Sequence, residues 1–240
     1  MRILAQGEAG IVVELGDAID PALNARVRRL ARELADRLRG RVLEVVPTYR
    51  SLLVVHDPLR EPRTSLVRDI EGLARAVAEA PADDLERVVR IPVCYGGAHG
   101  PDLEAVAAHA GLPPAEVVSL HAAPVYRVYM LGFLPGFPYL GGLDRRIACP
   151  RLDSPRTRIP PGSVGIGGEQ TGIYPVESPG GWRLLGRTPL HLFDPAAQRP
   201  FLLGAGDGIR FVPIDEAAFA ELSSRAAAGG LAPETEGAAR

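Results

Sequence analysis

The sequence has no lysine. All 27 of its basic residues are arginine, in a chain of 240 residues. A Schiff-base lysine and a phosphate-loop lysine are therefore excluded within this chain, and any bound anion must be held by arginine or by backbone N–H groups. A compositional bias of the genome would give the same arginine usage, and it is the simpler explanation of the pattern.

Cysteine and the usual metal-binding spacings are also scarce. The two cysteines, Cys94 and Cys149, form no CxxC pair, which argues against a disulfide framework or a zinc site and fits a reducing compartment. The five histidines show no HxH or HExxH spacing, and no GxSxG nucleophile motif occurs. We therefore expect no metal site in this chain, and no motif identifies a catalytic residue.

A strong net charge and long apolar runs are absent as well. The formal net charge is −2 and the isoelectric point is near 6.2, so the chain lacks the basic field that attracts nucleic acid or an anionic membrane. No window approaches the roughly 18 apolar residues of a membrane span, and the N-terminus has no long apolar signal region. These features predict a cytoplasmic protein with neither a nucleic-acid nor a membrane partner.

Residues 1–84 have the pattern of an α+β domain. Strand-like runs and amphipathic helices follow one another in the order β-β-α-β-β-α, which predicts a two-layer sandwich with both helices on one face of the sheet. The expected strands are 2–5, 10–15, 42–46 and 51–56, and the expected helices run from Asp20 to Gly40 and from Leu66 to the residues before Pro81.

The remaining chain has the pattern of a mainly-β domain. The polar, turn-prone segment from Pro81 to Glu86 marks the boundary, which predicts a second domain at 85–226 and a flexible tail at 227–240. A strand at 87–95 and two short helices are followed by many short strands between glycine and proline turns, and then by a closing helix. This pattern is typical of a β-barrel or a β-sandwich. The expected short helices are 102–110 and 113–121, the closing helix is 215–226, and the short strands include 191–193 and 209–214.

The stretch from Leu131 to Pro189 is the centre of the sequence. Glycine and proline are too frequent there for a helix of ordinary length, and aromatic residues are interleaved with them. Loops of this composition form shaped surfaces, since each proline lowers the entropy lost on ordering. We therefore expect the functional surface in this stretch.

Several side chains in this stretch have two interpretations. The run PPGSVGIGG (160–168) could cradle an anion with successive N–H groups, although such spacing more often marks an ordinary tight turn. Trp182, in SPGGW (178–182), either walls a ligand site or fills a core. The nearby arginines suit a carboxylate or phosphate but equally a solvated loop, and the nearby carboxylates are candidate acids or bases. These residues are Arg151, Arg156, Arg158, Arg183 and Arg187, and Asp144, Asp153, Glu169 and Glu177.

Six longer motifs occur in a specific order along the chain. They are GEAGIVVELGD (7–17), IPVCYGG (91–97), GPDLE (100–104), GFLPGFPYLGGLD (132–144), PRTRIPPGSVGIGGEQTGIYPVESPGGW (155–182) and GRTPLHLFDP (186–195). Together they closely resemble the family that contains the B subunit of bacterial ATP-dependent 5-oxoprolinase, a sporulation-kinase inhibitor and the allophanate hydrolase subunit 1 domain. The resemblance runs nearly from end to end of the chain.

The resemblance implies that the second domain is a cyclophilin-like β-barrel. It also implies two partners, a companion C subunit of the allophanate hydrolase subunit 2 family and a separate A subunit. The implied reaction opens the lactam of 5-oxo-L-proline to L-glutamate, with ATP as the co-substrate of the complex. The isolated chain is expected to be inactive, because the motifs supply a cleft without an identifiable nucleophile.

Carried over position by position, the motifs imply a ligand cleft but name no catalytic residue. Arg158 is expected to point into that cleft, because the Pro160-Pro161 pair stiffens the chain beside it. The implied wall is Gly132, Phe133, Pro135, Gly136 and Phe137; the implied polar contacts are Arg158, Ser163, Gly165, Gln170 and Tyr174; and the implied rim is Ser178, Gly180, Gly181 and Trp182.

Two other functions stay open at this level. A regulatory protein that inhibits a sensor histidine kinase would carry the same motifs, because one scaffold can serve different partners. A prolyl isomerase rests on fold analogy alone. Hydrolysis of an unstrained lactam toward glutamate is unfavourable enough that coupling to ATP makes chemical sense, and we favour the enzyme subunit.

Overall fold

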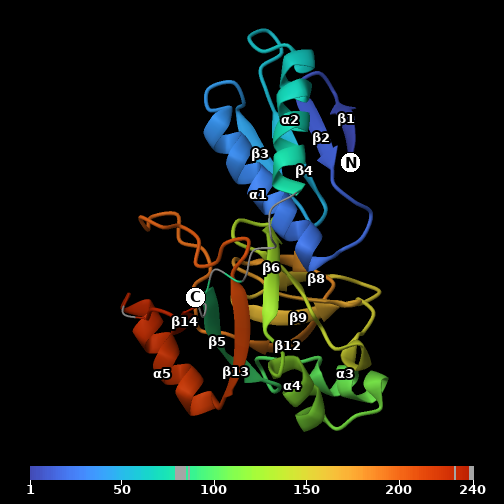
Figure 1. The fold of residues 1–240 in the computed structure, drawn as a ribbon. Coiled ribbons are helices and arrows are strands. Elements are labelled where there is room, and N and C mark those ends of the chain that lie inside the picture. The colour runs from blue at the N-terminus through green and yellow to red at the C-terminus, as the bar shows by residue number, and fades with distance from the viewer. Residues whose placement is uncertain (79–84, 86, 230, 238–240) are drawn as a thin grey trace. The chain divides into compact units, whose positions relative to one another are not determined.

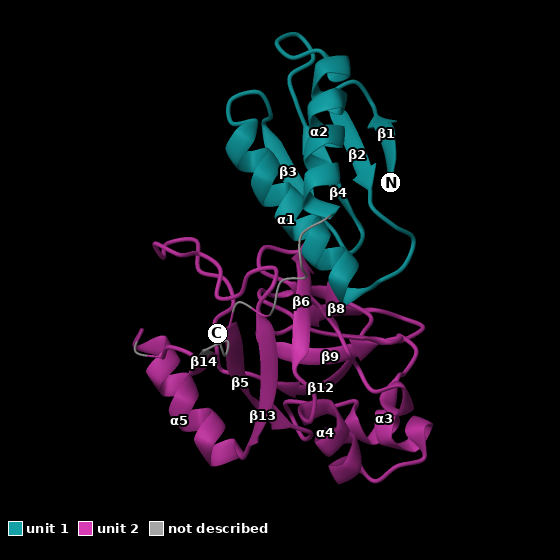
Figure 2. Cartoon of the chain, viewed as in Figure 1, with its two compact units in different colours: residues 1–84 teal, residues 85–240 magenta. Residues whose placement is uncertain are grey.

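The computed structural model describes residues 1–78, 85, 87–229 and 231–237. The chain forms two compact units, residues 1–84 and 85–240 (Figure 2). Apart from Leu85, the segment where we placed the domain boundary lies outside the described residues. Within the described residues, no helix combines the length and the apolar character needed to cross a membrane.

The first unit contains a four-stranded antiparallel sheet and two helices (Figure 1). Asp20 begins the first helix as predicted: its Oδ1 accepts a hydrogen bond from the Leu23 N–H at 2.8 Å, and Pro21 follows at the first helical position. Apolar side chains of the sheet and of both helices form one buried core, which includes Val13, Leu34 and Ile70. The elements are β1 Arg2–Gln6, β2 Gly10–Glu14, α1 Pro21–Arg37, β3 Glu44–Pro47, β4 Ser51–Val55 and α2 Arg63–Ala78, and the strand order is β1-β2-β4-β3.

The second unit is built on a closed barrel of seven strands, which confirms the predicted barrel (Figure 1). The strands follow the order β12-β9-β10-β7-β6-β13-β5, and pairing of β12 with β5 closes the ring. The β5–β13 pair is parallel, with Val89 opposite Ile209, whereas the other barrel pairs are antiparallel. The barrel strands are β5 Arg87–Tyr95, β6 Tyr126–Leu131, β7 Pro138–Gly141, β9 Ser163–Gly167, β10 Gln170–Ile173, β12 Arg183–Arg187 and β13 Gly208–Ile214.

Further elements surround the barrel. Strands β8 and β11 pair with each other as a separate two-stranded ribbon. No strand forms at 191–193, where Phe193 makes a single bridge to Phe201. These elements are β8 Arg156–Ile159, β11 Ser178–Gly180, α3 Leu103–Ala110, α4 Pro114–Ala122, a 3-10 turn Arg145–Ile147 and α5 Glu216–Ala227.

The segment that we expected to be a flexible tail contains a strand. Strand β14, Thr235–Gly237, pairs with the first residues of β5. On the same edge of β5, β12 pairs with its last residues. Ion pairs fix it, since the Arg90 guanidinium lies 3.2 Å from the Glu234 carboxylate and 3.1 Å from that of Glu236. The expectation missed this strand because the open edge that β14 covers exists only after the barrel has closed.

The barrel core contains a buried histidine that bonds two hydroxyl groups. The Thr171 hydroxyl donates to the Gly165 carbonyl at 3.0 Å, so it accepts from His121 Nε2 at 2.9 Å. His121 Nδ1 then accepts from the Tyr95 hydroxyl at 2.8 Å. Complete burial lowers the pKa of His121 to about 3, because the imidazolium would lose its hydration. The ring is therefore neutral and links α4, β5 and β10.

The two units have separate cores, and we expect the second to fold without the first. The described core residues of the first unit lie between Ile3 and Val77, and those of the second lie between Val89 and Leu231, so no residue serves both. A fragment of residues 85–240 should therefore show a cooperative urea transition followed by the fluorescence of Trp182, the single tryptophan. An aggregated fragment, or one without a transition, would contradict the proposed domain boundary.

Candidate functional site

A cavity of about 350 Å³ lies in the second unit, within the stretch that the sequence singled out. We call it the aromatic cavity, because aromatic side chains dominate its wall. Six of the fourteen predicted site residues converge on it, which supports placing the candidate site here. The lining residues are Phe133, Phe137, Tyr139, Arg151, Pro155, Tyr174, Pro179, Gly180, Gly181 and Trp182.

Phe137 is at the centre of the aromatic wall. Its ring makes edge-to-face contacts with Phe133, Tyr139, Tyr174 and Trp182, at centroid distances of 5.6, 5.3, 5.4 and 5.6 Å. Such contacts stabilise one mutual orientation of the rings. Phe137, Tyr174 and Trp182 are also buried, so the wall is fixed by packing before any ligand arrives.

The glycine-rich run does not cradle an anion. Its residues Ser163–Gly167 form the buried barrel strand β9, whose backbone is paired on both sides. A Cβ on Gly167 would overlap the indole of Trp182, and a Cβ on Gly172 would lie 2.9 Å from the Phe137 ring. The glycines are therefore needed because they let the aromatic rings lie directly on the barrel wall.

The loop 132–137 carries backbone strain at the edge of the cavity. Phe133 has a φ of 65°, in the left-handed region that a bulky side chain seldom adopts, and the residue is 64% exposed. The Gly132 N–H donates to the Phe137 carbonyl at 3.1 Å and closes the loop. Strained backbone of this kind persists only where the surroundings hold it, and it clusters at ligand sites. Gly132, Pro135 and Gly136 shape this loop but do not line the cavity.

The predicted polar contacts lie elsewhere. Arg158 does not line the aromatic cavity. Its side chain is 76% exposed, and its Nε donates a hydrogen bond at 2.6 Å to Glu177, which directly precedes the other ribbon strand, β11. The Ser163 hydroxyl donates to the Pro160 carbonyl at 2.8 Å. Gly165 and Gln170 belong to barrel strands, and the hydroxyl of Ser178 is buried without a hydrogen-bond partner among the described residues.

Arg151 is the cation that the structure brings to the cavity. Its guanidinium carbon lies 5.9 Å from the centre of the Trp182 ring, within the range of a cation–π contact. A guanidinium beside an aromatic wall can bind a carboxylate with two parallel hydrogen bonds. Arginine content alone gave five candidates in this part of the chain, and only the fold selects Arg151.

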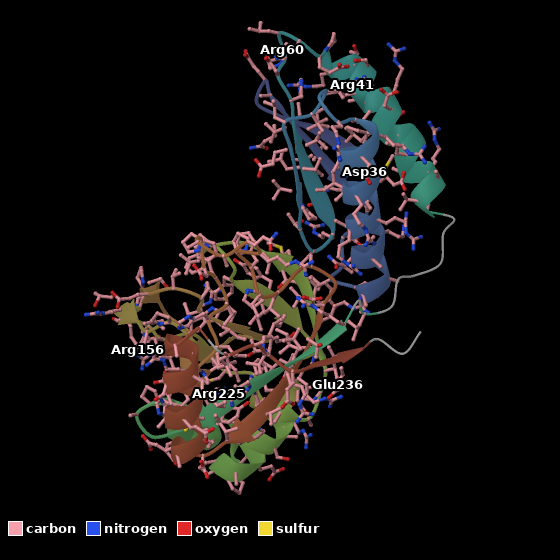
Figure 3. The ribbon with its side chains drawn as sticks, turned by 90° about the vertical axis from the view of Figure 1, so that its left-hand side faces the viewer. Asp36, Arg41, Arg60, Arg156, Arg225 and Glu236 are labelled. Carbon is pink, nitrogen blue, oxygen red and sulfur yellow. The ribbon has the colours of Figure 1, made fainter. Side chains whose placement is uncertain are left out.

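A partly buried ion pair supports the start of β12, which directly follows the tryptophan. The Asp102 carboxylate accepts from Arg156 at 2.8 Å and from the Leu184 N–H at 2.7 Å. Arg156, labelled in Figure 3, also approaches the Trp182 carbonyl at 3.5 Å. Asp102 precedes α3 but does not cap it with its side chain. The pair therefore positions Trp182, a role that the sequence did not indicate.

The cavity offers hydrogen-bond donors but no carboxylate. Burial raises the pKa of Tyr174, so its phenol stays protonated and can donate at neutral pH. Among the described residues no acidic side chain lines the cavity. Glu177 faces Arg158, Glu169 lies 3.8 Å from Arg145, and Asp144 lies 2.7 Å from Arg146.

Such a site can bind an apolar ring that bears an anionic group, and among the described residues its lining contains no carboxylate that could serve as a general base. A metal is not indicated by the side chains: in the described part of the chain, no three histidine, cysteine, aspartate or glutamate side chains gather as metal ligands would.

Comparison with known proteins shows similarity along most of the chain. The family model "Carboxyltransferase domain, subdomain C and D" matches residues 1–203. The 5-oxoprolinase B subunit of Escherichia coli O157:H7 is 48% identical over 211 residues, which cover 88% of this chain and 94% of that protein. The 5-oxoprolinase B subunit of Bacillus subtilis (strain 168) is 44% identical over 223 residues, 88% of this chain and 91% of that protein.

Solved structures are similar as well. A conserved uncharacterized protein from Pyrococcus horikoshii is 44% identical, with a TM-score of 0.55, and the match covers 91% of this chain and 100% of that one. Another solved protein, 40% identical with a TM-score of 0.76, is longer, and this chain spans 40% of it. The Kluyveromyces lactis urea amidolyase is 22% identical with a TM-score of 0.79, and the match covers 98% of this chain and 16% of that enzyme. At that identity the likeness concerns the fold alone.

Proposed function

Because this chain belongs to the family of the 5-oxoprolinase B subunit, we propose that it acts with companion subunits to open 5-oxo-L-proline to L-glutamate, coupled to ATP hydrolysis. The observation that carries the proposal is the 48% identity to the Escherichia coli protein over 94% of its length. The proposal includes a cyclophilin-like barrel, a companion C subunit, a separate A subunit and a cytoplasmic location.

In this proposal the aromatic cavity binds the lactam. The five-membered ring lies against Trp182 and Phe137, and its carboxylate pairs with the Arg151 guanidinium. The Tyr174 phenol donates a hydrogen bond to the lactam oxygen. A volume of about 350 Å³ is at the small end of the range for ligand pockets, which suits a substrate of this size.

The chemistry assigned to the complex has two steps. The lactam oxygen attacks the γ-phosphorus of ATP, so that an O–P bond forms and ADP leaves. In the second step, hydrolysis, one water adds to the activated ring carbon and the C–N bond breaks as the ring nitrogen takes a proton, which gives γ-glutamyl phosphate; a second water then displaces phosphate and leaves glutamate. In this proposal the chain binds the substrate and donates hydrogen bonds, and a companion subunit supplies the general base.

Reconstitution tests the proposal directly. We expect the purified chain to show no turnover, and its complex with the C and A subunits to form ADP and glutamate only when 5-oxoproline is present. L-Proline, which has the same ring and carboxylate but no lactam carbonyl, is the matched control and should not stimulate ADP formation. Turnover by the chain alone would refute its dependence on partners. A complex that hydrolyses ATP equally with and without 5-oxoproline would refute the function.

A further inference from the structure

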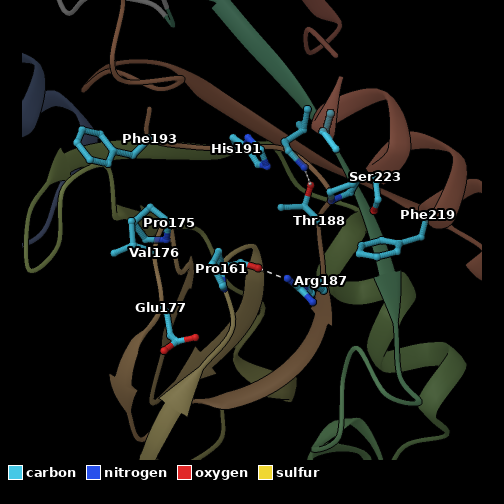
Figure 4. Close-up of a pocket in the computed structure, with 14 residues that line it drawn as sticks. Pro161, Pro175, Val176, Glu177, Arg187, Thr188, His191, Phe193, Phe219 and Ser223 are labelled. Carbon is cyan, nitrogen blue, oxygen red and sulfur yellow. Dashed lines mark hydrogen bonds between the residues drawn. The ribbon is translucent and has the colours of Figure 1, made fainter. Parts of the chain in front are cut away.

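A second, larger cavity lies elsewhere in the same unit. Its volume is about 580 Å³, and it extends between α5 and the loops that follow β8, β10 and β12 (Figure 4). We call it the α5 cavity. None of its lining residues lines the aromatic cavity. Most of its wall is apolar and includes Pro161, Pro175, Leu190, Phe193 and Phe219.

Arg187 gives this apolar cavity a fixed positive charge. It is the last residue of the barrel strand β12, and its Nε donates to the Pro161 carbonyl at 2.8 Å (Figure 4). That bond holds the guanidinium in place, and within the described parts of the chain its two terminal nitrogens make no hydrogen bond. Among the described residues, no carboxylate forms an ion pair with Arg187. A second possible donor, the exposed imidazole of His191, lines the same cavity.

The negative charge of the acidic side chain in the described lining is neutralised by an arginine that lies outside the lining. Glu177 lines the cavity, but its carboxylate accepts from Arg158 Nε at 2.6 Å, and Arg158 itself is not part of the lining. The Glu177–Arg158 pair therefore has no net charge, whereas Arg187 keeps its charge. Because a held guanidinium with free donors binds carboxylate or phosphate groups, the cavity is suited to an anionic ligand with a large apolar part.

The two cavities are adjacent along one segment of the chain, from Tyr174 to Gly180. Pro175, Val176 and Glu177 line the α5 cavity, and Tyr174, Pro179 and Gly180 line the aromatic cavity. The prolines in this segment restrict its backbone. Ligands in the two cavities would thus lie beside the same few residues, as transfer of a phosphoryl group from one ligand to the other requires.

We propose that the α5 cavity binds the nucleotide, with its phosphates on Arg187 and His191 and its base against Phe219, which lies on the Arg187 side of the cavity (Figure 4). This inference rests on the proposed function, which requires a small lactam and a larger nucleoside triphosphate. The volumes distinguish the two, since about 350 Å³ suits the lactam and about 580 Å³ suits the nucleotide. Phosphate binding by an arginine also agrees with the sequence, which contains no lysine.

Calorimetric titration of the full-length chain with Mg·ADP tests this inference. We expect measurable binding to the wild-type chain and a loss of about 10- to 100-fold in Arg187→Gln, since a charge-assisted contact to phosphate is removed. Arg225→Gln is the matched control. It removes the same charge from α5 (Arg225 is labelled in Figure 3) at a residue that lines a different cavity, and the affinity should stay within about twofold. Ala226→Phe, which fills the α5 cavity from the helix, should abolish binding without touching Arg187.

The outcomes separate this inference from the proposed function. Titration with 5-oxoproline, followed by Trp182 fluorescence, should be unchanged in Arg187→Gln, because the aromatic cavity is intact. If the wild-type chain does not bind Mg·ADP, or if both Arg187→Gln and Ala226→Phe bind it as the wild type does, the nucleotide site is not this cavity. The proposed function still stands in either case if the complex hydrolyses ATP only with 5-oxoproline.

Discussion

Replacing Arg151 with alanine should lower kcat/KM for 5-oxoproline about 10- to 100-fold in the assembled complex. The guanidinium beside Trp182 is the cation that lines the aromatic cavity, and a hydrogen bond to a charged group contributes about 1.5–3 kcal/mol. The carboxylate of the substrate is remote from the carbon that reacts, so its contact is made equally in the ground state and the transition state. The loss should therefore appear mainly as a higher KM, with kcat changed much less.

Arg158→Ala is the matched control for this experiment. Its side chain is 76% exposed and pairs with Glu177 on the ribbon surface, where an ion pair contributes little, so we expect less than a roughly threefold change. Arg151→Lys should restore only part of the affinity, because an ammonium group cannot form two parallel bonds to the carboxylate. A larger effect of Arg158→Ala than of Arg151→Ala would contradict the role of Arg151 and return Arg158 to the lactam site, as the motifs implied.

The second large effect is a loss of stability in mild acid. His121 has a pKa of about 3 in the folded chain and an ordinary value of 6.5, because its buried imidazolium is penalised. Below pH 6.5 the unfolded chain takes up a proton that the folded chain does not, so the free energy of unfolding should fall as the pH falls from 6.5 toward 3. The slope should approach about 1.4 kcal/mol per pH unit once the unfolded state is fully protonated.

The window between about pH 6 and pH 5 isolates this contribution from the carboxylates. Ion pairs lower the pKa of Glu61 and of Asp144 to about 2, so these groups reduce stability only at lower pH, between their ordinary values and about 2. Urea unfolding followed by Trp182 fluorescence reports on the second unit alone. We expect His121→Gln to be less stable but to lose the slope, and His109→Gln, an exposed residue on α3, to keep it. The same slope in His121→Gln and the wild type would assign the effect to another group.

The elements that the sequence predicted are those with local signals. Asp20 and Pro21 mark the start of α1, Gly111 ends α3 in the left-handed conformation, and the glycines and prolines after Leu131 leave only short strands. Each signal acts within a few residues of the structure that it specifies. Patterns of this kind were sufficient to predict a β-barrel or a β-sandwich in the second half of the chain, and the family resemblance favoured the barrel.

What the sequence could not show depends on residues far apart in the chain. The barrel includes the parallel pairing of β5 with β13, in which Val89 at the start of the second unit lies opposite Ile209 near its end, and no local feature of either strand names the other as its partner. Sequence separation also explains why the glycine run was ambiguous. Gly167 must be small because the indole of Trp182 lies against it, and the sequence does not show that contact. The sequence favoured Arg158 because of the adjacent Pro160-Pro161 pair, whereas the aromatic cavity is built from residues between Phe133 and Trp182, and Arg151 is the arginine among its lining residues.

The placement of β14 also bears on how the protein behaves in concentrated solution. Strand β5 pairs along one side with β13, and its other side is taken by β14 over Arg87–Val89 and by β12 over Cys94–Tyr95. An uncovered strand edge presents unpaired N–H and C=O groups that can add a strand from another molecule. Residues 235–237 thus act as a cap against intermolecular strand addition. A chain shortened before Thr235 would keep its barrel and both cavities, yet would offer neighbouring molecules a template for sheet growth.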